Sequence, residues 1–186
     1  MDYLRGITVT LRPATVDDLP AFRAALDTEE VARWWHWPDP AGDLADPEQH
    51  QLAITVKGET VGMIQWDEET DPDFRHASID VFVHPDQHRL GYGTDAIVTL
   101  ARWLTDVRGH HRLTIDPAAE NEPAIACYRR LGFHPVGVLR QQWFDHRRGV
   151  WADGLLLDLL KGELSGELTG RLSNATLNDA TLNDGS

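Results

Sequence analysis

The spacing of apolar residues predicts a chain in which β-strands and α-helices are interspersed. Short alternating or continuous apolar runs indicate strands, and apolar residues three and four positions apart indicate helices. The predicted strands are residues 7–11, 52–56, 60–66, 77–83, 112–115, 136–140 and 155–160, and the predicted helices are residues 15–26, 27–35, 93–107 and 122–131. Lys57 and Gly58 join two of the strands into a hairpin, and loops are predicted over 36–47 and 67–73. This order indicates a mixed α/β fold.

The last part of the chain differs from the rest in composition. Beyond Lys161 the composition becomes Gly, Ser, Asn, Thr and Asp, and the segment ATLND at 175–179 is repeated at 180–184. So little apolar surface cannot offset the entropy lost on ordering. We therefore predict a single domain over residues 1–161, followed by a disordered or artificially added tail over 162–186.

Length and charge limit the classes of partner. A chain of 186 residues with 41% hydrophobic content can form one sizeable core. Its net charge of −13 disfavours nucleic acid and anionic membranes as partners and favours a cationic one, although solubility alone also explains such a charge. Without an N-terminal signal or an apolar run of ~18 residues, the sequence predicts a cytoplasmic protein, as a monomer or a homodimer.

A glycine-rich segment between a predicted strand and a predicted helix is a candidate phosphate site. Gly91-Tyr92-Gly93-Thr94 opens the helix, where free backbone N–H groups and the helix dipole attract anions. The Lys-Ser or Lys-Thr of a nucleotide P-loop is missing. The letters also fit a dinucleotide-binding G-x-G-x-x-A, but Rossmann glycines follow their strand almost immediately, whereas seven residues, His84 to Leu90, stand here. A purely structural turn is the other alternative.

Two carboxylates are candidates for contact with a cationic substrate. Alternation along the strand 77–83 places Ser78, Asp80 and Phe82 on one face, and an unpaired buried charge is costly. Asp80 therefore either reaches a cleft or forms a structural ion pair. Asp116 ends a strand before Pro117, where it can face a ligand or cap a turn. The nine histidines and the single cysteine show no metal-site spacing, so we predict no metal.

Two segments resemble the GNAT superfamily of N-acetyltransferases. The run from Val81 to Thr94 (VFVHPDQHRLGYGT) resembles its acetyl-coenzyme A loop, whose usual form is Gln/Arg-x-x-Gly-x-Gly/Ala, with His88 here in place of Gln or Arg. The run from Asn121 to Phe133 resembles its N-x-x-A-x-x-x-Y-x-x-x-G-F segment. The resemblance covers about residues 7–160 and implies the GNAT acyltransferase fold, a mostly antiparallel central sheet flanked by helices.

The same resemblance implies acetyl-CoA as the cofactor and direct transfer to an amine, without an enzyme nucleophile. A base must then accept the proton of the amine, and an acid must protonate the leaving thiolate. Tyr128 matches the family tyrosine near the sulfur and is the candidate acid, unless it is simply a core tyrosine; Asp80 is the second catalytic candidate. The implied cofactor-binding residues are Val81, Phe82, Val83, His88, Arg89, Gly91, Tyr92, Gly93, Thr94, Asn121, Ala124 and Tyr128.

Further segments resemble aminoglycoside 6′-N-acetyltransferases, which act in antibiotic resistance. They are residues 31–35, 66–72, 79–80 and 116–117. The implied acceptor is a small cationic amine, bound by Trp34, Trp35, Asp67, Glu68, Glu69, Asp80 and Asp116. Acidic loops are also typical of solvated surface, and paired tryptophans are typical of a core. A lysine-like siderophore precursor, a protein amine, or a non-catalytic coenzyme A-binding module are the alternatives.

Overall fold

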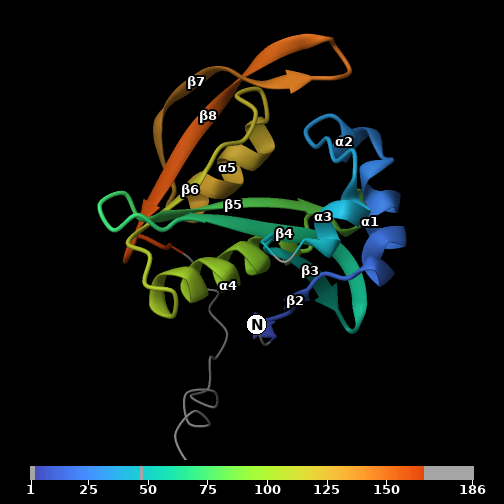
Figure 1. Ribbon diagram of the computed structural model, residues 1–186, viewed down its shortest axis with the longest axis horizontal. Helices are drawn as coiled ribbons and strands as arrows, with labels where there is room; N and C mark the ends of the chain where they lie inside the picture. The colour runs from blue at the N-terminus through green and yellow to red at the C-terminus, as the bar shows by residue number, and fades with distance from the viewer. Residues whose placement is uncertain (1–2, 47, 166–186) are drawn as a thin grey trace, which may run out of the picture.

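A single eight-stranded sheet organises the protein (Figure 1), and the computed structural model describes residues 3–46 and 48–165. The strands are β1 Leu4–Arg5, β2 Thr10–Pro13, β3 Gln51–Val56, β4 Glu59–Glu69, β5 His76–Val83, β6 Arg112–Ile115, β7 His134–Asp145 and β8 Val150–Leu160. The helices are α1 Leu19–Leu26, α2 Glu29–Ala32, α3 Pro40–Ala45, α4 Tyr92–Asp106 and α5 Glu122–Arg130, with 3₁₀ turns η1 Val16–Asp18 and η2 Pro85–Gln87. The predicted α/β class is confirmed.

The sheet is mostly antiparallel. Its order is β1-β2-β3-β4-β5-β6-β8-β7, and β5 with β6 is the parallel pair among the described strands. The predicted hairpin at Lys57 and Gly58 joins β3 to β4, with both residues at the positive φ that a tight two-residue turn needs. In Figure 1 the β7–β8 hairpin extends past α5 toward α2, away from the other strands.

Two apolar clusters cover the two faces of the sheet. Ile79 and Val83 of β5 belong to the larger cluster, together with the buried face of α4. Phe82 belongs to the second cluster, with Phe22 of α1 and Val31 of α2. This division confirms the predicted alternation of β5, which leaves Asp80 on the same face as Phe82.

The N-terminal prediction was wrong in detail. Residues 7–9, predicted as strand, form the turn between β1 and β2. The carboxylate of Asp95, in the first turn of α4, accepts backbone hydrogen bonds from Ile7, Thr8 and Val9 at 3.0, 2.7 and 3.0 Å. The turn is thus held by a residue distant in sequence, which no local pattern reveals.

Two predicted loops contain regular structure. The loop predicted over 36–47 includes α3, which begins at Pro40 after Asp39, whose carboxylate accepts a hydrogen bond from the amide of Gly42 at 3.1 Å. The acidic loop predicted over 67–73 begins as strand, because β4 pairs with β5 as far as Glu69 and His76.

The domain extends slightly beyond the predicted boundary at residue 161. Leu164 packs against the larger cluster, and the amide of Ser165 donates to the carbonyl of Leu131 at 2.9 Å. Residues 162–165 are therefore part of the fold rather than of the tail. The remainder of the predicted tail, residues 166–186, lies outside the described residues.

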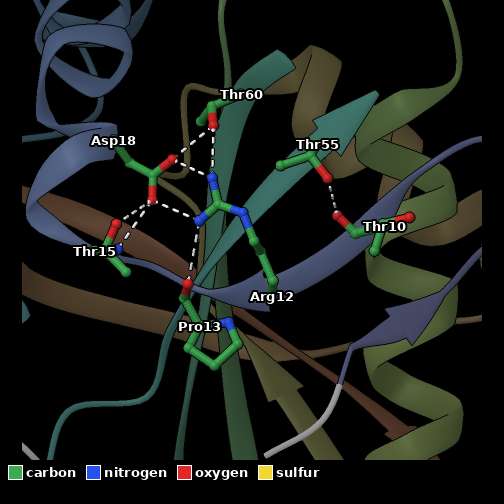
Figure 2. A network of polar contacts seen from close by, with 7 residues as sticks. All are labelled: Thr10, Arg12, Pro13, Thr15, Asp18, Thr55 and Thr60. Atoms are coloured by element: carbon green, nitrogen blue, oxygen red, sulfur yellow. Dashed lines mark hydrogen bonds and ion pairs between the residues drawn. The ribbon is translucent and has the colours of Figure 1, made fainter. Parts of the chain in front are cut away.

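A buried ion pair joins the entry of α1 to the sheet. Figure 2 shows the guanidinium of Arg12 on β2 directed at Asp18, which Thr60 and Thr15 also approach. Arg12 Nη2 lies 2.6 Å from Asp18 Oδ1, and the Asp18 side chain is 3% exposed. Burial opposes ionisation of Asp18, but the hydrogen bonds from Arg12, Thr60 and Thr15 outweigh it and lower its pKa to about 2.

We expect Asp18→Asn to destabilise the fold by about 2 kcal/mol at pH 7. A pKa lowered from its usual 3.8 to about 2 means that ionised Asp18 stabilises the folded state above about pH 4, and that this stabilisation is lost as the pH falls toward 2. Urea unfolding at pH 7 and at pH 3 measures the effect. The exposed neighbour Asp17→Asn is the control, and an Asp18→Asn deficit that persists undiminished at low pH contradicts the assignment.

Candidate active site

The loop between β5 and α4 presents free backbone amides. Gly91 is the N-cap of α4 and has φ 83°, a conformation that glycine adopts without strain. The first helical hydrogen bond is donated by the amide of Asp95 to Gly91, and among the described residues the amides of Tyr92, Gly93 and Thr94 have no acceptor. These amides form the N-terminus of α4, where an anion binds favourably.

His88 stabilises the shape of this loop. Its Nε2 lies 2.8 Å from the backbone carbonyl oxygen of Val83, at the end of β5. The Gln or Arg usual in the family motif is thus replaced by a side chain that ties the loop to its strand. Arg89, at φ 62°, and Leu90 are exposed beside it.

The sheet opens beside this loop. Of the described residues, β5 and β6 pair only at Ala77 with Leu113 and at Ser78 with Thr114. Beyond Ser78 the edge of β5 that faces β6 has no strand partner, and near its end the carbonyl of Val83 is bound by His88. An extended chain with amide groups can bind there, adjacent to the free amides of α4.

A cleft with a volume of about 410 Å³ lies at this opening. Its walls come from the segment after α2, from β4 and β5, from the end of β6 and the start of α5, and from the β7–β8 hairpin. The lining residues are Trp34, Trp35, His36, Gln65, Asp80, Val81, Ile115, Asp116, Pro117, Ala118, Asn121, Tyr128, Gln142, Trp143, Phe144 and His146. The cleft thus collects both predicted tryptophans, two of the predicted carboxylates and the predicted tyrosine.

Asp80 is a cleft carboxylate whose pKa is raised. Burial raises its pKa to about 6, and the charges of Asp116 and Asp67 act in the same direction. A hydrogen bond from Gln65 Nε2, at 3.3 Å, opposes the shift. Burial likewise raises the pKa of Asp116, against a hydrogen bond from Gln142. A carboxylate with a pKa near 6 can accept a proton and release it again close to physiological pH.

Tyr128 reaches the same cleft from α5. Its side chain is largely buried, and burial raises its pKa, as do the nearby Cys127, Asp80 and Asp116. Among the described residues, no group lies within hydrogen-bond distance of its hydroxyl. The raised pKa keeps the phenol neutral, and Tyr128 is one of the residues that line the cleft. Asn121 begins α5, and its side-chain oxygen accepts a hydrogen bond from the amide of Ala124 at 3.3 Å.

The two tryptophans form one wall of the cleft. The ring of Trp35 packs edge-on against Phe82, with a centroid separation of 5.1 Å. The guanidinium carbon of Arg33 lies 4.4 Å above the ring of Trp34. Both side chains are partly buried, and Trp35 also packs against the second core cluster.

The structure separates the three consecutive acidic residues that were predicted to bind the acceptor, Asp67, Glu68 and Glu69. Asp67 is exposed on β4 opposite Ser78, and its charge acts on Asp80. Glu69 is exposed and accepts the amide of Asp71 at 2.9 Å, in the turn after β4. Glu68 points to the opposite face, where His110 Nε2 lies 2.8 Å away and Arg108 forms an ion pair. The strand alternation therefore places Glu68 on the face opposite Asp80, outside the cleft.

We expect Glu68→Gln to lower the free energy of unfolding by about 2 kcal/mol, with the KM for the acceptor amine unchanged. Burial opposes its ionisation, but the hydrogen bonds from His110 and Arg108 outweigh this and lower the pKa of Glu68. Substitution leaves Arg108 without its carboxylate on the face away from the cleft. Thermal unfolding and steady-state kinetics check both parts, and a raised KM for the acceptor amine contradicts the placement.

Several cleft residues were missed from sequence. Gln65, Gln142, Trp143, Phe144 and His146 lie outside both family-like motifs. Gln65 stands opposite Asp80 on the neighbouring strand, a register that a correct alignment of the β4–β5 hairpin would have revealed. The others belong to the β7–β8 hairpin, of which only residues 136–140 and 155–160 were predicted as strand.

Metal ligation and membrane insertion find no support in the described part of the chain. No group of three or more His, Cys, Asp or Glu side chains there is arranged to hold a metal ion. No helix within residues 3–46 and 48–165 combines the length and the apolar character needed to cross a membrane.

The sheet therefore opens between its two parallel strands, beside a helix whose first amides have no acceptor among the described residues. The chain belongs to the acetyltransferase (GNAT) family, whose sequence model matches residues 12–133. It is therefore an N-acetyltransferase.

Curated relatives of the chain differ in their substrates. It is 28% identical over 156 residues to an aminoglycoside N(6′)-acetyltransferase type 1 of Klebsiella pneumoniae, covering 71% of this chain and 77% of that protein. It is 26% identical over 148 residues to the spermidine N(1)-acetyltransferase of Escherichia coli K12, covering 74% and 78%. A solved structure of Mycobacterium smegmatis RimJ in complex with CoA-disulfide superposes with a TM-score of 0.75 at 23% identity, covering 89% and 88%.

Proposed function

We propose that the protein transfers the acetyl group of acetyl-CoA to a primary amine of an aminoglycoside. The observation that carries the proposal is the cleft in which Asp80, Asp116 and Tyr128 meet a wall of tryptophans. Carboxylates attract the ammonium groups of an amino sugar, and flat aromatic faces pack against its rings. The similarity to an aminoglycoside acetyltransferase supports the same acceptor.

The chain offers a continuous site for acetyl-CoA, which supplies the thioester when bound. The free amides of Tyr92, Gly93 and Thr94 would hold the pyrophosphate at the N-terminus of α4. The edge of β5 that has no strand partner, around Val81, would hold the amide-bearing arm of the coenzyme. The coenzyme bound along β5 would reach the cleft, since Val81 is also part of the cleft wall.

Two side chains would move the protons. Asp80 accepts a proton from the acceptor ammonium, directly or through water, because its pKa of about 6 makes it mostly ionised at neutral pH. Tyr128 donates its phenolic proton to the leaving thiolate, since its raised pKa keeps it protonated. No residue forms a covalent intermediate, so that the acetyl group passes in one step from thioester to amine.

Asp116 and the tryptophans would orient the acceptor. Asp116 binds a second part of the cationic substrate across the cleft from Asp80, and Trp34 and Trp35 stack against a sugar ring. Asp67 adds negative charge at the rim and draws the cation in.

Thiol release from acetyl-CoA in the presence of a panel of amines tests the proposal. The panel contains kanamycin, spermidine, a lysine derivative and a peptide with a free N-terminus. We expect kanamycin to have a kcat/KM at least about tenfold above the others, a difference of about 1.4 kcal/mol. Turnover of spermidine or the lysine derivative without kanamycin contradicts the acceptor class. Coenzyme binding without any turnover favours a non-catalytic module.

A further inference from the structure

Gln142 occupies an irregular position on β7. The pairing of β7 with β8 shifts register between Leu139 and Trp143, and Gln141 has φ 52°. The backbone amide of Gln141 donates a hydrogen bond to Asp153 Oδ1 at 2.8 Å, which stabilises this bulge. Because of the extra residues, Gln141 is exposed while Gln142 turns toward the cleft.

The side-chain amide of Gln142 forms a hydrogen bond with the carboxylate of Asp116. Its Nε2 donates to Asp116 Oδ2. Its Oε1 is buried and has no hydrogen-bond partner among the described residues. Since an ionised carboxylate only accepts hydrogen bonds, the amide orientation follows from this contact. Gln142 therefore makes its one side-chain hydrogen bond within the described chain to a cleft carboxylate.

Gly154 of β8 makes this contact possible. A Cβ atom built on Gly154 would lie 1.7 Å from Gln142 Oε1 and 2.8 Å from its Cδ. Gly154 does not have a positive φ, so its backbone conformation does not require glycine. The need is for space, because the Gln142 side chain crosses β8 at this point on its way to Asp116.

We propose that Gln142 is a positioning residue that holds the Asp116 carboxylate in place for the ammonium group of the acceptor, with Gly154 as the residue that leaves room for it. The inference rests on the proposed function and adds a determinant of acceptor affinity to it. One oxygen of Asp116 is held by the amide, which leaves the other for an ammonium donor. Without the side-chain amide the carboxylate loses this hydrogen bond, and the cation loses a partner held in one orientation.

Steady-state kinetics of two single variants and their double variant test this role. Gln142→Met keeps the length of the side chain and removes its donor, whereas Gly154→Ala keeps the donor and displaces it. We expect each to raise the KM for kanamycin about tenfold, with kcat and the KM for acetyl-CoA within about twofold of the wild type. The double variant Gln142→Met/Gly154→Ala should raise the KM for kanamycin no further than either single variant does, because both substitutions break the same contact.

The split between the two KM values distinguishes positioning from a structural role. General loosening of the β7–β8 hairpin would change kcat and both KM values together, and thermal unfolding monitors folding of each variant. Gln141→Asn, at the exposed neighbour, is the matched control and should behave as wild type.

The outcomes separate this inference from the proposed function. A wild-type enzyme that acetylates kanamycin while Gln142→Met leaves its KM unchanged overturns the role of Gln142 alone. Multiplicative effects of the two substitutions in the double variant overturn the role of Gly154. A wild-type enzyme that acetylates no amine of the panel overturns the proposed function, and the inference with it.

Discussion

Tyr128→Phe should lower kcat by roughly 100-fold and leave the KM for acetyl-CoA unchanged. Removing the hydroxyl deletes the proposed proton donor and keeps the ring. The centroid of this ring lies 6.2 Å from that of the Phe133 ring. The leaving thiolate must then be protonated by water, so the loss falls on the chemical step. Burial raises the pKa of Tyr128, so we expect no alkaline limb from this residue below pH 10 in the wild type.

Thiol release under saturating substrates measures this effect. Tyr3→Phe is the matched control, because Tyr3 is 63% exposed in the N-terminal segment. A Tyr128→Phe enzyme with wild-type kcat removes Tyr128 as the acid. A loss confined to the KM for acetyl-CoA would assign it to coenzyme binding instead.

Asp80→Asn should lower kcat/KM by a similar factor of about 100 at pH 7 and abolish the acidic limb of the pH profile. In the wild type, Asp80 is active when ionised, and burial raises its pKa to about 6. Activity should therefore fall as the pH drops through about 6. The asparagine variant keeps the shape of the side chain and has no ionisation, so its residual activity should not follow this limb.

A pH series of kcat/KM from about pH 5 to 9 checks this prediction. Asp106→Asn serves as the control, since Asp106 lies at the end of α4 and forms an exposed pair with Lys161 at 3.5 Å. An acidic limb that survives unchanged in Asp80→Asn assigns the titration to another group. In that case Asp116, whose pKa burial also raises, is the next candidate.

Local sequence patterns predicted the elements that pack on the core. Residues 93–107 carry helical spacing and form α4, and the alternation in 77–83 correctly divides β5 between the two clusters. These patterns succeed because burial of one face imposes a period of 3.6 or 2 on the sequence. The turn at residues 7–9 was misassigned because its geometry depends on Asp95, which no local pattern includes.

Strand register explains why the predicted acidic segment is divided between the two faces of the sheet. Asp67, Glu68 and Glu69 formed one acidic segment in the sequence, but β4 continues through them and turns Glu68 toward Arg108 and His110. A loop would have left all three free to face a cation. The direction of each of these side chains depends on how far β4 pairs with β5, and that pairing is a contact between two segments.

The sequence by itself determined the α/β class, and it predicted a coenzyme loop at Gly91 and roles for Asp80 and Tyr128, because backbone conformation, burial periodicity and motif spacing are local properties. Only the tertiary structure decided that Asp80, Asp116 and Tyr128 line one cleft, that Glu68 lies outside it, and that Gln142 reaches Asp116 over Gly154. These relations depend on strand register, on a bulge in β7 and on the space above one glycine. Such features arise from pairing and packing between distant segments, and no single stretch of sequence contains them.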